Sequence, residues 1–376
     1  MKIKTLVWSN DNWFCNKENI FVDADLILLY GNRDLLENET VYNKLRATTK
    51  GVIVSNSTSG HLINDEIFDS GAVATAIKFN KTKIKTAIFN IEKFNNGASL
   101  GKAIYKELEN ENLSYIYIIS DGQIVNGSNL VDGLKTNLKN EVLITGGLAG
   151  DGARFEKTLV GLDTPPQTGN VVAVGFYGNS LKIGYGSNGG WSSFGPDRVV
   201  TKSNQNVLYE LDGRSALSLY KEYLGDFVKD LPASALYFPL CINLSSGESV
   251  VRTILSINEE EQSMTFAGNI PEGRRARLMK SHLHKLIGGA EVAVNDSLTK
   301  FEDEKPELAI VVSCVGRKII MKHNVEEEIE ALRHELGDNC TIAGYYAYGE
   351  IAPNSNTRKK CELHNQTITL TTLSEI

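Results

Sequence analysis

Two segments of the chain repeat one pattern, and this repeat restricts the fold more than any other feature of the sequence. Each segment begins with a short apolar run, continues with apolar residues at helical spacing, and ends in a second apolar run that leads into a glycine-bearing turn and an acid. The first starts at "SYIYIISDG" and ends at "EVLITGGLAGD"; the second starts at "LAIVVSCVGR" and ends at "CTIAGYYAYGE". A strand–helix–strand unit in each half predicts an α/β fold with an internal duplication.

The helical stripes of the two segments are Leu130, Leu134 and Leu138, and Val325, Ile329, Leu332 and Leu336. Asn324 can cap the second helix and Gly337 can end it. Further helices are predicted over 99–112, 213–224 and 271–287, and hairpins over 171–203 and 252–266. The chain is therefore predicted to form mixed sheets in two related α/β domains, residues 1–203 and 204–376.

The ends of the predicted strands gather the polar residues of both segments. Because right-handed crossovers make the two strands of each unit parallel, their carboxyl ends lie on one sheet edge, where α/β proteins bind small ligands. In the first half this edge gathers Ser120, Asp121, Gly122, Gly146, Gly147, Gly150 and Asp151, and a strand over 51–61 adds Ser57, Thr58, Ser59 and Gly60. In the second half it gathers Ser313, Cys314, Arg317, Tyr346, Tyr348 and Glu350.

These residue types suit a small ligand that carries both charges. Glycine turns leave backbone amides available for an anion, acids can hold an ammonium, and Arg317 can hold a carboxylate as a fork. A zwitterion such as a free amino acid matches both groups. The alternative is that each turn only reverses the chain, which glycine permits. "GGLAGDG" matches neither nucleotide-binding glycine motif, which excludes a phosphate loop of either kind.

The composition excludes several classes of function. The formal net charge of −7 argues against a nucleic-acid footprint, and five scattered cysteines without a Cys-x-x-Cys pair indicate a reducing compartment. The N-terminal apolar run is too short for a signal peptide, and no apolar stretch approaches the roughly 18–20 residues of a membrane helix. We therefore expect a cytoplasmic protein that binds no nucleic acid and does not insert into a membrane.

Two patterns leave catalytic chemistry open as an alternative. Asp121, Asp151 and Glu350 can together bind a divalent cation or act as acid and base, provided that the two halves pack suitably. His282 and His284 would face one way on a strand, as metal ligands do, but the surrounding sequence favours a helix, which separates them.

Cys314 is a further candidate for reaction chemistry. Paired with a histidine, it would be a nucleophile. The alternative is a cysteine packed at the end of a buried strand.

The motifs at the predicted strand ends resemble those of the FIST family of intracellular signal-transduction proteins over nearly the whole chain. "SNSTSG", "SDG" and "GGLAGDG" are similar to the motifs of its N-terminal domain, and "SCVGR" and "GYYAYGEIAP" to those of its C-terminal domain. The segment that begins "SNGGWSSFGPDR" resembles the junction between the domains and adds Trp191 to the candidate ligand-binding residues. His61 stands where many members of the family have an acid.

The resemblance implies a sensory protein that binds a small ligand, with amino acids as the favoured class. Some members of the family bind haem and sense nitric oxide beside a histidine kinase, so haem is a second expectation. Its iron would take a ligand from His61, His282, His284, His323, His334 or His364, or from a thiolate or tyrosinate. No kinase, cyclase or methyl-accepting segment is present in the sequence, so we expect the signal to pass to a separate partner protein.

Overall fold

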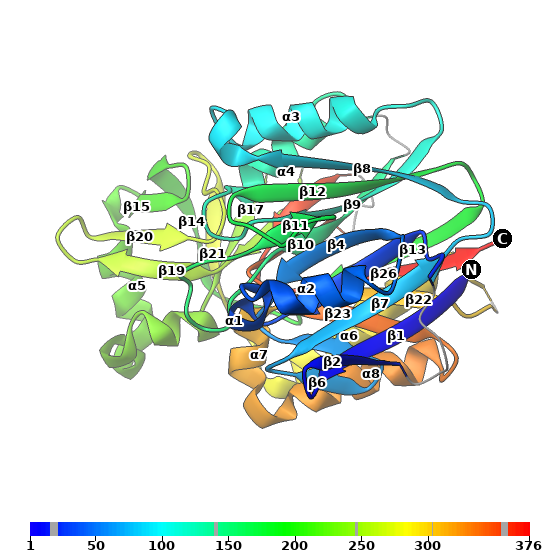
Figure 1. Ribbon diagram of the computed structural model, residues 1–376. Coiled ribbons are helices and arrows are strands. Elements are labelled where there is room, and N and C mark those ends of the chain that lie inside the picture. Colours follow the sequence, from blue (N-terminus) through cyan, green and yellow to red (C-terminus); the bar gives the residue numbers. More distant parts are fainter. Residues whose placement is uncertain (16–21, 139–141, 245–246, 303, 355–359) are drawn as a thin grey trace.

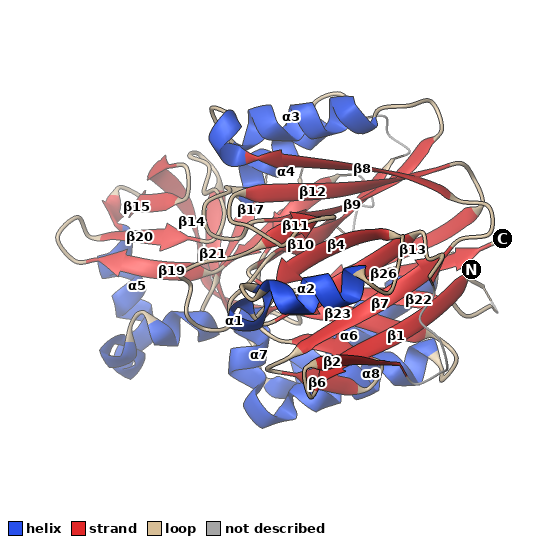
Figure 2. Cartoon of the chain, viewed as in Figure 1, coloured by secondary structure: helices blue, strands red, loops and turns tan. Residues whose placement is uncertain are grey.

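Three six-stranded sheets share one apolar core in this computed structural model, and helices cover their outer sides (Figure 1, Figure 2). The structure describes residues 1–15, 22–138, 142–244, 247–302, 304–354 and 360–376. The central core takes apolar side chains from all three sheets. Full burial of each such side chain stabilises the fold by roughly 1.5–3 kcal/mol.

The first sheet has the order β11–β4–β3–β7–β1–β2. Its strands are β1 (Lys2–Ser9), β2 (Asn12–Cys15), β3 (Leu26–Gly31), β4 (Val52–Ser57), β7 (Ala72–Lys78) and β11 (Val160–Leu162). Helices α1 (Arg33–Leu36) and α2 (Glu39–Arg46) pack on its outer side through Leu36, Val41 and Leu45.

The second sheet has the order β25–β24–β10–β9–β12–β8. Its strands are β8 (Lys83–Asn90), β9 (Leu113–Ser120), β10 (Leu143–Leu148), β12 (Asn170–Tyr177), β24 (Gly349–Pro353) and β25 (Cys361–His364). Its outer side packs against α3 (Gly97–Leu108) and α4 (Gly127–Lys135), and the short helix η1 (Ile91–Lys93) precedes α3.

The third sheet has the order β13–β26–β22–β23–β5–β6. Its strands are β5 (His61–Ile63), β6 (Glu66–Phe68), β13 (Leu181–Asn188), β22 (Leu308–Cys314), β23 (Thr341–Ala347) and β26 (Ile368–Glu375). Helices α6 (Leu283–Leu298) and α8 (Val325–Leu336) cover its outer side, while α7 (Val315–Met321) and η4 (Lys322–Asn324) connect β22 to α8.

The three sheets repeat one strand order, so the described residues form three related units. The orders β4–β3–β7–β1, β10–β9–β12–β8 and β23–β22–β26–β13 correspond, and in each the first two strands named are parallel while the other pairs are antiparallel. We call residues 2–78 the first unit, 83–177 the second, and 181–188 with 283–375 the third. The two predicted strand–helix–strand segments are confirmed, and they belong to the second and third units. The first unit is a further copy that the sequence pattern did not reveal.

Each unit also lends a strand to the sheet of another unit. Strand β5 of the first unit pairs with β23, β24 of the third pairs with β10, and β11 of the second pairs with β4. The units therefore interlock, and two sheets contain strands from both sides of residue 203. The division of the chain at residue 203 stays a prediction.

A ring of backbone hydrogen bonds joins the turns that follow β4, β10 and β23. In this ring Gly150 N donates to Ser57 O (3.0 Å), Ser59 N donates to Tyr346 O (2.9 Å), and Tyr348 N donates to Leu148 O (3.4 Å). Each bond links one unit to the next. The ring therefore brings together three turns that are far apart in the sequence.

The third unit is interrupted by an inserted module, residues 192–280, which projects to the left in Figure 1. Its strands are β14 (Ser192–Asn204), β15 (Val207–Leu211), β16 (Arg214–Ser215), β17 (Leu240–Asn243), β18 (Ser249–Arg252), β19 (Ile254–Asn258), β20 (Ser263–Phe266) and β21 (Arg275–Lys280). Its helices are α5 (Ala216–Leu224), η2 (Gly225–Asp230) and η3 (Ala233–Tyr237). The module has an apolar core of its own.

Most of the predicted helices are confirmed, and so is the hairpin over 252–266, which is formed by β19 and β20. Two predictions are wrong. The segment 271–287 is not one helix, because Arg275–Lys280 pairs with β14 and β17 and the helix begins only at Leu283. Within 171–203, β12 and β13 do not form a hairpin, because the turn at Gly178 carries the chain from the second sheet to the third.

In the part of the chain that the structure describes, no helix combines the length and apolar character needed to cross a membrane.

Candidate functional site

A cleft with a volume of about 600 Å³ lies beside the ring of turns. All three units line it: Thr58, Ser59 and Gly60 belong to the first, Asp151 and Arg154 to the second, and Lys318 to the third. The cleft is therefore the place where predicted strand-end residues of different units meet.

The hydroxyl groups of the turn after β4 hold this turn in place. Ser57 Oγ accepts a hydrogen bond from Leu159 N (2.9 Å), and Ser59 Oγ donates to Gly152 O (3.0 Å). Thr58 Oγ1 donates to Gly31 O (3.3 Å). The turn thereby presents Thr58, Ser59 and Gly60 to the cleft in a defined conformation.

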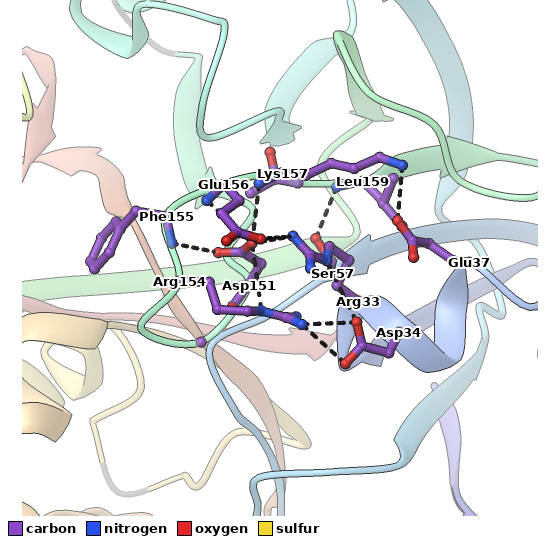
Figure 3. Close-up of polar contacts among 12 residues, drawn as sticks. Arg33, Asp34, Glu37, Ser57, Asp151, Arg154, Phe155, Glu156, Lys157 and Leu159 are labelled. Carbon is purple, nitrogen blue, oxygen red and sulfur yellow. Dashed lines mark hydrogen bonds and ion pairs between the residues drawn. The ribbon is translucent and has the colours of Figure 1, made fainter.

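Asp151 organises the loop over residues 151–159, which we call the Asp151 loop. Asp151 is 1% exposed, and its carboxylate accepts hydrogen bonds from Phe155 N (3.0 Å), Lys157 N (3.1 Å) and Arg33 Nη1 (2.8 Å) (Figure 3). The hydroxyl of Tyr348 also donates to it. Because each oxygen already accepts two or more hydrogen bonds, the carboxylate has little capacity left for a ligand.

Ion pairs attach the Asp151 loop to α1 and the residue that follows it. Arg33 contacts Glu156 (3.2 Å) as well as Asp151, and Lys157 contacts Glu37 (2.8 Å). Arg154 Nη1 contacts both carboxylate oxygens of Asp34, at 2.8 and 3.0 Å (Figure 3). The second unit is thus connected to the first through charged side chains that flank the cleft.

The side chain of Lys318, in the middle of α7, extends from the third unit to the first. Its Nζ donates to Ser59 O (3.0 Å) and to the carboxylate of Asp69, and lies 4.9 Å from the ring centroid of Tyr346. A Cβ atom at residue 60 would overlap this ammonium group, so the glycine there makes room for it.

The predicted residues of the second half form a separate, buried group. Arg317 is fully buried and donates to Glu328, to Gly189 O (2.9 Å) and to Leu286 O (2.9 Å). Ser313 also donates to Glu328 (3.1 Å). Arg317 therefore has a carboxylate partner inside the protein and does not face the cleft.

Glu350 and Cys314 lie in the same interior. Oε2 of Glu350 accepts hydrogen bonds from the amide (3.1 Å) and hydroxyl (2.7 Å) of Thr367, whereas Oε1 has no hydrogen-bond partner among the described residues. Burial raises the pKa of Glu350 to about 8 and also raises the pKa of the Cys314 thiol.

Trp191 is not among the residues that line the cleft, and its Nε1 donates a hydrogen bond to Gln366 O (2.8 Å).

Asp121 has a turn-forming role like that of Asp151. Its carboxylate accepts from the amides of Gln123 (2.7 Å), Ile124 (2.9 Å) and Gly169 (2.8 Å). The Ser120 hydroxyl donates to the carbonyl of Asp121 (3.0 Å). Gly122, Gly146 and Gly147 stand where a Cβ would meet neighbouring atoms at less than van der Waals distance, so close packing explains these glycines.

The cleft thus unites only part of the predicted set: Thr58, Ser59, Gly60 and Asp151 line it, and Ser57, Gly150, Tyr346 and Tyr348 contact its walls. Its charged residues Asp34, Asp69, Arg154, Lys318 and Lys322 were missed by the sequence reasoning. For two of them the sequence held a signal, because Arg154 and Lys318 each follow a predicted strand-end turn within a few residues.

The side chains of the cleft do not fit a haem group. Among its described lining residues there is no histidine, cysteine, methionine or tyrosine that would serve as an axial ligand. His61 is buried beside the cleft, with its Nδ1 3.2 Å from Thr58 Oγ1, and burial lowers its pKa to about 3. His364 Nε2 lies 3.0 Å from Ala352 O.

Among the described residues, no group of three or more His, Cys, Asp or Glu side chains is placed so that it could hold a metal ion. Asp121, Asp151 and Glu350 each accept hydrogen bonds from different segments of the chain. His282 is the residue before α6 and His284 lies in its first turn, so the two are not neighbours on a strand.

Comparison with known proteins agrees with this architecture. A family model for the FIST N domain matches residues 25–214, and one for the FIST C domain matches residues 216–353. An uncharacterized protein of Methanocaldococcus jannaschii is 26% identical over 280 residues, which cover 65% of this chain and 52% of that protein. The match thus spans about half of the relative's length. Because the two family models together match most of the chain, it belongs to the FIST family, whose domains are sensory domains of signal-transduction proteins.

Proposed function

We propose that this protein senses a small polar ligand of the amino-acid class, which binds in the cleft, and that it passes the signal to a separate partner protein. The observation that carries the proposal is that residues of all three units line the cleft, with side chains of both charges and with hydroxyl groups that the first unit supplies. Carboxylates, ammonium and guanidinium groups, and hydroxyls are the groups that recognise a small zwitterion.

The location of the cleft supports a role in signalling. A ligand that contacts several units stabilises only those arrangements of the units in which its contacts are made, and so shifts the population towards them. Links between the units at the cleft are made by charged side chains, such as Lys318 with Asp69 and Arg154 with Asp34. Such links rearrange more easily than an apolar core.

Binding is favoured over catalysis because the acids proposed for reaction chemistry are engaged elsewhere. Asp121 and Asp151 hold turns, and Glu350 lies in the protein interior. None of the three is presented to the cleft as an unbonded carboxylate.

Thermal unfolding of the full chain in the presence of single amino acids tests the proposal. A ligand at about 100 times its Kd should stabilise the protein by about 2.7 kcal/mol and raise Tm. Ser70→Tyr, which narrows the cleft, should abolish this rise, whereas Ser256→Tyr on the exposed strand β19 should not. Failure of every amino acid to raise Tm, at concentrations well above millimolar, would contradict the proposed ligand class.

A further inference from the structure

Two cations of the cleft share one arrangement, in which a backbone carbonyl holds the cation and an aspartate carboxylate covers it. Lys318 Nζ donates to Ser59 O (3.0 Å) and to Asp69. Arg154 Nε donates to Asp151 O (3.0 Å), and its Nη1 contacts Asp34. These two cations and both aspartates line the cleft, where Lys322 is a third cation.

The cations are anchored more firmly than the carboxylates that cover them. The Lys318 side chain is 17% exposed and that of Asp69 is 83% exposed; the corresponding values are 36% for Arg154 and 64% for Asp34. An ion pair with such an exposed partner contributes little free energy, so the aspartate is readily exchanged for another anion. The hydrogen bond from Arg154 lowers the pKa of Asp34, so the pairing favours the ionised form of this carboxylate.

The position of Lys318 is built into the first and third units. Gly60 has φ +118° and leaves the space that the ammonium group fills, while the Tyr346 ring lies below it at 4.9 Å. A backbone carbonyl and an aromatic face hold the cation even when its carboxylate partner leaves.

We propose that the cleft binds a small dicarboxylate, whose two carboxylate groups replace those of Asp34 and Asp69 on Arg154 and Lys318. This inference rests on the proposed function and names the chemical class of its ligand. In the ligand-free protein the two aspartate side chains stand in for the ligand, since they present the same functional group to the same two cations. An acidic amino acid belongs to this class.

A cationic ligand is less compatible with the geometry. To pair with Asp69 in the cleft, an amine must either displace Lys318 from the Ser59 carbonyl and the Tyr346 ring or compete with it for one exposed carboxylate. A carboxylate ligand keeps both of those contacts.

The exchange would alter the links between units. Asp34 lies on α1 and Asp69 follows β6, so both belong to the first unit, whereas Arg154 belongs to the second and Lys318 to the third. When the ligand replaces the aspartates, the first unit loses one ion pair with the second unit and one with the third. The ligand then joins the second and third units through Arg154 and Lys318. This gives the bound and free proteins different contacts at the place where the units meet.

Calorimetric titration of the full chain with succinate, glutarate and glutamate tests the inference, with propionate and glutamine as probes that carry a single carboxylate. We expect the dicarboxylates to bind at least tenfold more tightly than the single carboxylates. Asp34→Asn and Asp69→Asn should each tighten dicarboxylate binding roughly two- to fivefold. Each substitution removes a carboxylate that competes with the ligand for a cation, and the ion pair that is lost contributes only the small free energy of an exposed pair. Lys318→Met and Arg154→Met should abolish binding.

Glu304→Gln is the matched control, because Glu304 is 72% exposed and pairs with Lys182 at 2.9 Å outside the cleft lining. It should leave affinity unchanged, and thermal unfolding should show that all variants are folded. Weaker binding in Asp69→Asn would show that this aspartate binds an amine of the ligand and would overturn the inference.

Two further outcomes separate this inference from the proposed function. If amino acids without a second carboxylate bind as tightly as glutamate, and the aspartate variants do not change affinity, the dicarboxylate assignment fails while the sensory cleft stands. If no amino acid and no dicarboxylate binds, both proposals fail.

Discussion

The hydroxyl of Tyr348 donates a hydrogen bond to the carboxylate of Asp151, across the boundary between the third and second units. The Tyr348 ring also stacks on Phe155 of the Asp151 loop, with ring centroids 4.5 Å apart. Since the same carboxylate accepts from Arg33 of the first unit at 2.8 Å, all three units meet at one buried side chain. Asp151 is therefore a junction that shapes the wall of the cleft.

Asp151→Asn should destabilise the protein by about 3 kcal/mol. The substitution turns one buried acceptor of several hydrogen bonds into a donor and leaves Arg33 without its buried partner. Glu156→Gln is the control, because Glu156 contacts the same arginine but is 64% exposed, and we expect less than about 1 kcal/mol. Urea unfolding measures both. Equal effects of the two substitutions would contradict the junction role.

Gly60→Ala should destabilise the protein and also displace Lys318. An alanine there meets the ammonium group of Lys318 and adopts a φ of +118°, which an L side chain rarely takes. Gly178→Ala provides the comparison, since Gly178 also has a positive φ but no atom lies within 4 Å of its added Cβ. We expect about 1 kcal/mol for Gly178→Ala and at least ~1 kcal/mol more for Gly60→Ala. Thermal unfolding of both variants checks this difference.

Glu350→Gln should stabilise the protein more at alkaline than at acidic pH. Burial raises the pKa of Glu350 from 4.5 to about 8 in the folded protein. Between these values the folded state binds the proton and the unfolded state does not, so this group's contribution to stability falls as pH rises and is constant above about 8. Glutamine keeps an acceptor for Thr367 and does not ionise.

The measurement for Glu350→Gln is the difference in unfolding free energy between variant and parent at pH 5, 7 and 8.5. The difference should grow by at least ~1 kcal/mol over this range. Burial lowers the pKa values of His61 and His364, which contribute in the opposite direction below about pH 6.5, but equally in both proteins. A difference that stays constant would show that Glu350 is ionised in the folded state.

Arg317→Met should lower the unfolding free energy of the protein even when no ligand is present. It leaves Glu328 buried and without its cation, which typically destabilises by about 3–5 kcal/mol. The double variant Arg317→Met/Glu328→Gln should recover much of this loss, because the remaining buried group is uncharged. If Arg317→Met instead weakens ligand binding and leaves unfolding unchanged, this arginine contacts the ligand as the sequence suggested.

Much of the fold was predictable because its signals are local. The helix over 325–336 follows from one apolar stripe and a terminal glycine, and the structure confirms it as α8. The predicted cap is wrong, because the Asn324 side chain makes no capping hydrogen bond and donates instead to Glu327 (2.8 Å). The parallel pairs β9/β10 and β22/β23 follow from two apolar runs separated by a helical stripe. The first unit was not recognised, because its helices α1 and α2 are short and no helical stripe separates the apolar runs of β1 and β3.

The candidate site was only partly predictable, because single charged residues in a sequence look like solvated surface. Nothing near Lys318 in the chain indicates that it will meet Asp69, which is 249 positions away. The same holds for Arg154 and Asp34, which are 120 positions apart.

By itself, the sequence determined the parallel strand pairs of the second and third units, most of the predicted helices, the polar turns at the strand ends and the family resemblance. These depend on steric preferences and apolar periodicity over a few residues. Only the tertiary structure decided which turn faces a cleft and which faces the core. Each unit lends a strand to another unit's sheet, and these pairings join residues far apart in the chain. Through them the strand end at Ser59 lies beside Lys318, whereas Arg317, one position earlier, is buried against Glu328.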